Sequence, residues 1–195
     1  GRAYPARDML RQAWESDWTF ALRLMEEWGL VFWFEHAKDR HTLVVSDTSG
    51  GFHRHGIAYE ELRFHAGGRI DEEHISSLAV THTVTAGKAC VNDHDYMQPR
   101  LRRSNAPNRQ TYEAAGGTAD PNIEIYAPAE FAQPDTFPSS YPHDAREEGQ
   151  YLARVKVEAA RCKGLRAKGT GRLRGLQPGR TFRLVNYPQD SANRE

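Results

Sequence analysis

The sequence predicts an α+β fold, mainly antiparallel β, in which two helices buttress two barrel-like modules. Residues 16–28 and 145–165 carry apolar side chains at steps of three and four, the period of an amphipathic helix. Several short runs between them are rich in β-branched and aromatic residues and are separated by Gly and Pro. These runs indicate antiparallel strands of a barrel or sandwich.

The most informative stretch, near the N-terminus, reads ESDWTFALRLMEEWG, LVFWFEH, AKDRH and TLVVSD. Ser16 is a suitable N-cap, Asp17 lies in the positive first turn, and Gly29 is a natural C-terminal stop. A hairpin is predicted over residues 30–47, with a loop at 37–41. We expect the apolar helix face to be buried on that hairpin; its residues are Trp18, Ala21, Leu22, Met25 and Trp28.

Further strands are predicted on both sides of a region rich in Pro, Arg and Asn. Residues 74–84 alternate between apolar and polar types, and we expect them to pair with residues 89–96 across a turn at 86–88. Residues 99–122 show little periodicity and predict a long loop. Short strands or extended segments are predicted at 57–64, 122–126 and 181–185.

The second helix is followed by a strand pair punctuated by glycines, with a turn at Gln177-Pro178-Gly179. Its predicted buried face comprises Tyr151, Leu152, Val155, Ala159 and Cys162.

We expect three consecutive parts. A first module covers residues 1–98 and contains the helix at 16–28 and the hairpin at 30–47. A loop-rich connection follows at 99–144, and residues 145–195 add a helix and a β-hairpin. The abrupt start and the last three residues, which look like the beginning of a further strand, indicate an excerpt of a longer protein.

Composition places the chain among soluble proteins with large polar loops, because 38% of its residues are hydrophobic and its mean hydropathy is -0.75. No apolar run is long enough to span a bilayer, and no charged-then-apolar leader opens the sequence. We therefore expect cytoplasmic synthesis and, for an exported protein, a route that reads no N-terminal signal peptide. Cys90 and Cys162 match no metal or redox spacing.

The net charge is zero but unevenly distributed. Residues 1–145 hold 14 Lys and Arg against 21 Asp and Glu, a balance of -7, whereas residues 146–184 hold 11 against 3, a balance of +8. Such a division indicates that one part faces another part, or a partner of opposite sign.

A metal-dependent hydrolase is one alternative. His53 and His55 lie in a Gly-bounded loop and could supply two ligands, with the others among His65, His74, Asp93 and Asp95. However, no third ligand has a diagnostic spacing and HExxH is absent, so a solvated loop is the favoured interpretation of the histidines. In a strand, Asp93 and Asp95 point away from His94, so these neighbours form no acid-base dyad. We therefore expect no catalytic residue, no metal site and no cofactor.

A nucleic-acid-binding module is the other alternative, since residues 146–183 are strongly basic. Such a module would depend on Arg172 and Arg174. We expect no exposed aromatic residues for base stacking in this segment, and the remaining chain is acidic, so a surface that pairs with acidic neighbours in an assembly is favoured.

Three groups of residues resemble the spike proteins of type VI secretion, known as valine-glycine repeat (VgrG) or Rhs element Vgr proteins. The first is ESDWTFALRLMEEWGLVFWFEH followed by DRHTLVVSD. The second comprises Glu72, Glu73, Ile75, Val91, Asp93, Asp95, Tyr96 and Pro99; the third comprises Arg174, Gly175, Leu176, Pro178, Gly179, Phe182 and Leu184. Late control protein D and other baseplate hub proteins of contractile phage tails share a looser form. The resemblance covers most of the chain and is weakest from 100 to 140.

This resemblance implies a non-enzymatic role in the phage tail hub-like part of the spike. Three copies would form a hub that joins the tube to the puncturing needle. The implied partners are the tube ring protein, baseplate components, and effector or adaptor proteins, with no nucleic acid and no stable membrane anchor. The protein would reside in the bacterial cytoplasm before firing and then be secreted by the type VI machinery. A phage tail baseplate hub is the alternative within the same class.

Overall fold

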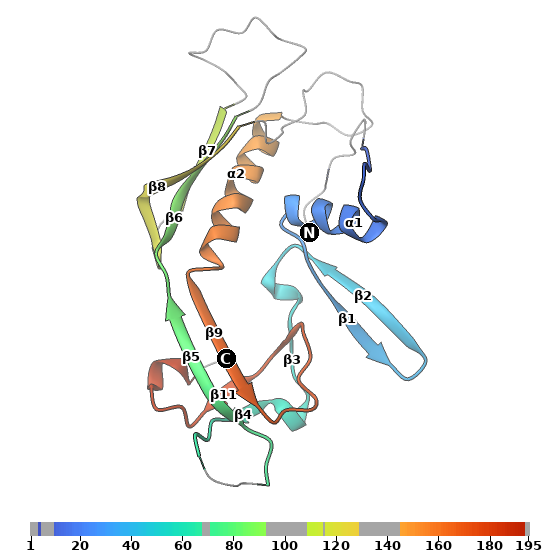
Figure 1. Ribbon diagram of the computed structural model, residues 1–195, viewed down its shortest axis with the longest axis vertical. Helices are drawn as coiled ribbons and strands as arrows, with labels where there is room; N and C mark the ends of the chain where they lie inside the picture. The colour runs from blue at the N-terminus through green and yellow to red at the C-terminus, as the bar shows by residue number, and fades with distance from the viewer. Residues whose placement is uncertain are drawn as a thin grey trace, which may run out of the picture. The chain divides into compact units, whose positions relative to one another are not determined.

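The computed structural model describes residues 4, 10–67, 71–92, 109–114, 116–128 and 145–193. The chain divides into two compact units, each assembled from two separate segments (Figure 1). The first unit comprises Gly1–Gly29 and His82–Leu165, and the second comprises Leu30–Thr81 and Arg166–Glu195. The predicted limits at 98, 99 and 144 lie outside the described residues, so the division into three consecutive parts stays a prediction.

The predicted α+β class is confirmed, with two helices and mostly antiparallel strands. Within the described residues, the strands form four sheets of two strands and one sheet of three. None of these sheets closes on itself, and three of the strand pairs are parallel.

The first unit is a three-stranded sheet with a helix packed on it. Its elements are α1 (Asp17–Glu27), β6 (Thr85–Asn92), β7 (Arg109–Glu113), β8 (Ala119–Pro128) and α2 (Ala145–Arg161). The strand order is β7-β6-β8, with β6 antiparallel to β7 and parallel to β8. Helix α2 lies along this sheet (Figure 1) and contacts all three strands. Small side chains let helix and sheet approach closely; the buried ones are Ala89, Val91, Ala114, Ala127, Ala153 and Val157.

The predicted turn at 86–88 is wrong, because Gly87 lies inside β6. A Cβ atom at Gly87 would stand 2.7 Å from the backbone oxygen of Asp120 in β8. The register between β6 and β8 shifts at this point, between Ala86 and Lys88. Here glycine therefore marks a β-bulge and a close approach of two backbones. Strand β7 also lies within the region predicted as a long loop.

Helix α2 is buried on a wider face than predicted. Leu152 and Val155 are buried as expected, whereas Ala159 and Cys162 are exposed. Ala153 and Val157, four residues apart, are fully buried toward the sheet.

The C-terminal end of α1 contacts α2. The Trp28 ring lies 6.0 Å from the Tyr151 ring, and the Tyr151 hydroxyl donates to the Trp28 carbonyl at 2.8 Å. The predicted burial of Trp28 is confirmed. The expectation for Trp18 is wrong, since 48% of this residue is exposed.

The second unit contains most of the short strands. They are β1 (Val31–Ala37), β2 (Arg40–Ser46), β3 (His53–Arg54), β4 (Glu61–Arg63), β5 (Ile75–His82), β9 (Leu165–Gly171), β10 (Arg180–Thr181) and β11 (Arg183–Val185), with short 3-10 turns at Ser49–Gly51, Ile57–Tyr59 and Asp190–Ala192. The last residue of β5 and the first of β9 belong to the first unit. The hairpin β1–β2 confirms the prediction, although Ala37 pairs with Arg40 and shortens the loop to two residues.

Two predicted pairings between neighbouring segments, of 74–84 with 89–96 and within the strand pair after the second helix, are replaced by pairings between distant segments. Strand β5 pairs with β9 instead of β6, β10 runs parallel to β3, and β11 runs parallel to β4. Leu62, Ile75 and Leu184 form the core around these strands. None of the helices in the described residues is long and apolar enough to cross a bilayer.

We predict that Gly179→Ala lowers the free energy of unfolding by about 3 kcal/mol. Gly179 has φ +75°, which costs an L-residue about 1–2 kcal/mol, and its Cβ would stand 2.5 Å from the buried indole of Trp33, an overpacking that adds about 1–3 kcal/mol. Urea titration followed by circular dichroism measures the change. Gly56→Ala is the control, because Gly56 has φ -63° and no neighbour within 4 Å; equal effects of the two substitutions would contradict the prediction.

Candidate functional site

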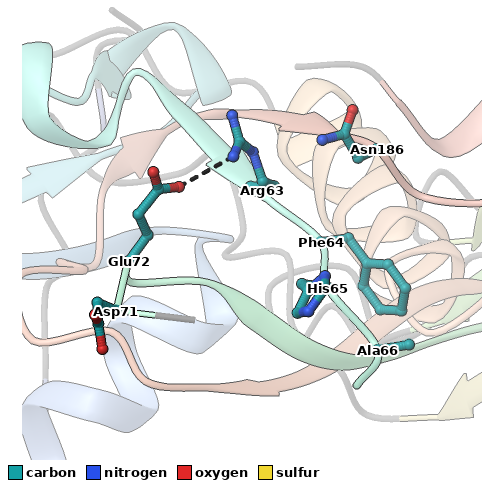
Figure 2. Close-up of a pocket in the computed structure, with 7 residues that line it drawn as sticks. All are labelled: Arg63, Phe64, His65, Ala66, Asp71, Glu72 and Asn186. Carbon is teal, nitrogen blue, oxygen red and sulfur yellow. Dashed lines mark hydrogen bonds and ion pairs between the residues drawn. The ribbon is translucent and has the colours of Figure 1, made fainter. Parts of the chain in front are cut away.

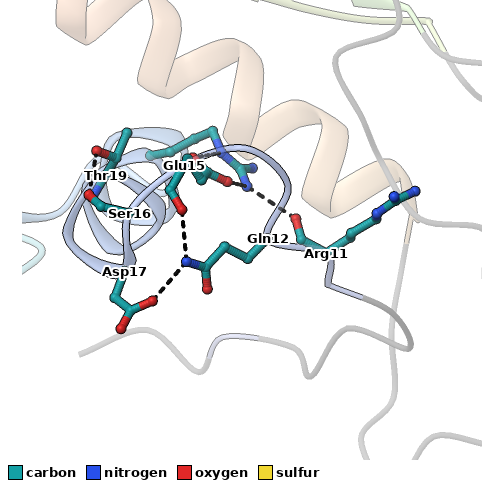
Figure 3. A network of polar contacts seen from close by, with 7 residues as sticks. Arg11, Gln12, Glu15, Ser16, Asp17 and Thr19 are labelled. Carbon is teal, nitrogen blue, oxygen red and sulfur yellow. Dashed lines mark hydrogen bonds and ion pairs between the residues drawn. The ribbon is translucent and has the colours of Figure 1, made fainter.

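The Glu-Ser-Asp motif fixes the start of α1 (Figure 3). The Ser16 hydroxyl accepts the backbone N–H of Thr19 at 3.2 Å, which confirms the predicted N-cap. Asp17 lies in the first turn, where a negative charge is favourable, and accepts the Gln12 side-chain amide at 2.8 Å. Ser16 and Asp17 therefore stabilise the N-terminal end of α1.

The motif glutamate binds an arginine two turns along the helix. The Arg23 guanidinium donates to both carboxylate oxygens of Glu15, at 2.7 and 3.3 Å. This charge-assisted hydrogen bonding lowers the pKa of Glu15 below its ordinary value of 4.5. The pair therefore clamps the segment before the helix onto the helix itself.

Two further family motifs meet at Tyr59 in the second unit. The Tyr59 hydroxyl donates to the Glu73 carboxylate and accepts the backbone N–H of Gly175 at 2.8 Å. The backbone N–H of Arg174 also donates to Glu73, at 3.4 Å. A Cβ on Gly175 would lie 2.5 Å from the Tyr59 ring, so this contact requires glycine. Tyr59, which belongs to neither motif, thus joins the Glu-Glu-x-Ile motif to the Arg-Gly-Leu motif through hydrogen bonds.

The first strand of the hairpin is anchored by the segment around the Pro-Gly turn. The Trp33 ring is 4% exposed and packs beside Gly179 and the Phe52 ring, the latter at 5.4 Å. On the same face of the strand, Glu35 pairs with Arg180 at 3.3 Å. The aromatic strand and the Pro-Gly turn, both parts of the resemblance, therefore form one packed structure.

Beside β4 lies a shallow hollow of about 720 Å³ (Figure 2). Its ion pair joins Arg63 and Glu72 at 3.0 Å, with both side chains more than half exposed. The lining residues are Arg63, Phe64, His65, Ala66, Asp71, Glu72 and Asn186. Opposite charges already paired and open to water provide a polar contact surface, without a buried group prepared for acid-base chemistry.

The histidines considered as metal ligands have other contacts. His55 Nε2 lies 3.0 Å from the Gly175 carbonyl, and His74 Nδ1 donates to the Glu72 carbonyl at 2.8 Å. The rings of His65 and His74 lie 5.8 Å apart, and His53 is exposed in β3. Asp93 and Asp95 lie outside the described residues. In the part of the chain that is described, no three His, Cys, Asp or Glu side chains gather as a metal site would require.

The basic segment pairs with the acidic part of the same chain. Three ion pairs link the two, Arg174–Glu73 at 3.9 Å, Arg180–Glu35 at 3.3 Å and Arg183–Glu61 at 3.3 Å. Each is partly exposed, so each contributes little stability by itself. Among the other basic side chains of the segment, Arg166, Lys168 and Arg172 are exposed on or just after β9.

Sequence reasoning missed two arrangements. Tyr59 lies in a segment predicted only as extended, and Gly175 is 116 residues away. His36 and His41, on opposite strands of the hairpin, were not considered as a pair. Their spacing around a short turn is the signal that could have revealed them, because residues that face each other across a hairpin lie symmetrically about its loop.

Large apolar side chains are exposed in both units. In the first unit they include Trp14 and Trp18. In the second, one face of the hairpin exposes Phe34, Leu43 and Val45 by 43–47%. Exposed apolar groups of this size mark interaction surfaces.

The motif residues of the second unit thus act as structural contacts between segments that are distant in the sequence. The chain belongs to the phage tail baseplate hub (GPD) family, which it matches over residues 1–195. It is 31% identical over 196 residues to the type VI secretion system spike protein VgrG1a of Pseudomonas aeruginosa, with 100% of this chain and 28% of that protein covered. The spike proteins VgrG1b and VgrG1c of the same bacterium are each 30% identical over 196 residues, with 100% of this chain and 24% and 25% of their lengths covered. The resemblance predicted from the motifs is confirmed, and the chain spans about a quarter of the length of these relatives.

We predict that Glu15→Gln makes thermal stability less dependent on pH in the acidic range. The folded-state pKa of Glu15 lies below 4.5. The Glu15 carboxylate therefore contributes to folding stability above pH 4.5, and this stability is lost as the pH falls through the folded-state pKa. Melting temperatures between pH 3 and pH 6 should therefore fall less steeply in the variant. Glu26→Gln, on the exposed side of the same helix, is the control and should follow the unchanged protein; identical profiles for all three proteins would refute the role of the Glu15–Arg23 pair.

Proposed function

We propose that this chain is part of a trimeric hub in a type VI secretion spike, where it joins the tube to the puncturing needle without catalysing a reaction. The single observation that carries the proposal is the match of all 195 residues to the baseplate hub family and to spike proteins. The fixed contacts at Glu15, Tyr59 and Trp33 support it, because a load-transmitting scaffold needs distant segments held in one arrangement.

The exposed apolar side chains are the second support for assembly. Trp14 and Trp18 in the first unit, and Phe34, Leu43 and Val45 in the second, remain in contact with water in the single chain. Association with other copies or with other spike components would bury such groups.

We further propose that the hub contains two barrel-like modules. Residues 1–98 form a first hub module, 99–144 a loop-rich connection, and 145–195 complete the hub domain. The small sheets have open edges, and strands added from the rest of the protein or from other copies would complete them. The partners proposed are the tube ring protein, baseplate components, and effector or adaptor proteins.

The proposed location is the bacterial cytoplasm before firing and the exterior afterwards, with export by the type VI machinery. A phage tail baseplate hub would use the same surfaces for the same structural task. We do not favour a metal-dependent hydrolase or a nucleic-acid-binding module, because His55 and Arg174 contact other groups of the chain.

We predict that reversing charges on β9 impairs the spike without unfolding it. In the full-length protein, Arg166→Glu with Lys168→Glu should reduce release of the tube protein into the medium at least about tenfold, because the introduced carboxylates then repel acidic neighbours in the assembly. Immunoblotting of the medium and of the cells measures release and protein level.

The matched control is Lys38→Glu with Arg40→Glu at the exposed tip of the hairpin, which reverses the same number of charges outside the basic segment. Normal release with the β9 variant would rule out this surface. Normal release after deletion of the whole gene would rule out the spike role.

A further inference from the structure

Two histidines face each other at the tip of the hairpin. His36 in β1 is directly opposite His41 in β2, one pair before the Ala37–Arg40 pair that closes the turn. Their Nδ1 atoms are 2.6 Å apart, and their rings lie nearly perpendicular with centroids separated by 4.8 Å. Both residues are exposed, so an ion in solution can reach them.

The short distance between the nitrogens restricts what can lie between them. One ring nitrogen donates and the other accepts, so a single proton occupies the contact and one lone pair points at it. Two Nδ1–H groups facing each other would repel. A metal ion can bind between the rings when the donating ring moves its proton from Nδ1 to Nε2, because each neutral imidazole then offers an Nδ1 lone pair.

We propose that His36 and His41 form a binding site for one divalent transition-metal ion of tetragonal preference, Cu²⁺ or Ni²⁺. Metal–imidazole bonds are about 2.0 Å long, so two such bonds at 90° place the nitrogens about 2.9 Å apart, and a tetrahedral angle places them about 3.3 Å apart. The observed 2.6 Å is closer to the first value. Imidazole ligands and square geometry are typical of Cu²⁺ and Ni²⁺.

The hairpin holds the two rings in place. Phe34 and Leu43 form the neighbouring cross-strand pair on the same face, so the histidines continue a ladder of side chains instead of standing on a loop. Within the described residues, no third His, Cys, Asp or Glu completes a cluster with them, which leaves the other coordination positions to water or to a ligand from another molecule. Two imidazoles without carboxylates do not suit Mg²⁺ or Ca²⁺.

Copper binding to the full-length protein tests the proposal. Added as Cu²⁺ alone, the metal should occupy one more site per chain in the unchanged protein than in His36→Ala or His41→Ala, as measured by isothermal titration calorimetry. Each substitution should weaken that site at least about tenfold, the effect that even outer-sphere partners of a metal can have. Electron paramagnetic resonance should show coupling to two nitrogens, and to one at most in either variant.

His82→Ala is the matched control, because His82 is an exposed histidine at the end of a strand in the same chain. It should bind copper as the unchanged protein does. Equal copper binding by the unchanged protein and the two tip variants would overturn the proposal, and so would an equal loss in His82→Ala. Because the readout is metal binding and not secretion, failure of this site leaves the proposed spike role untouched.

Discussion

The second unit depends on the burial of two leucines in neighbouring parallel strands. Leu62 of β4 and Leu184 of β11 are direct partners, exposed by only 2% and 6%, and Ile75 packs with them. Closing a loop of roughly 120 residues costs about 4 kcal/mol plus a constant. Burial of three aliphatic side chains contributes about 5–9 kcal/mol as an upper bound, which is enough to hold strands of three residues together.

The pairing of these strands brings basic and acidic side chains of the same chain into contact. Arg183 is the cross-strand partner of Glu61 and forms an ion pair with it. Arg180 forms an ion pair with Glu35 on the hairpin. The basic segment is therefore partly neutralised by its own chain, and its charge is not all available to a partner. Other exposed basic side chains lie on α2, just after it, and on or just after β9; they include Arg154, Arg161, Lys163, Arg166, Lys168 and Arg172.

The sequence was informative wherever the determining contacts are local. The N-cap at Ser16 and the hairpin over residues 30–47 are predicted from residues within a few positions, and the structure has both. Gly87 was misread because glycine serves a turn and a close backbone approach equally well, and only the position of Asp120 decides between them. The parallel partners of β3 and β4 could not be foreseen, since two or three residues carry no periodicity and their partners lie over 100 residues away. Each motif is recognisable by itself because its residues are close in the sequence. The contact of the motifs at Tyr59 was not predictable, because it joins residues that are far apart in the sequence.

We propose that this chain presents its exposed surfaces to copies of itself and to spike components without catalysing a reaction. Analytical ultracentrifugation of the full-length protein at low micromolar concentration tests that claim most directly. The account predicts a sedimenting species with the mass of three chains. A protein that remains strictly monomeric under these conditions would contradict it.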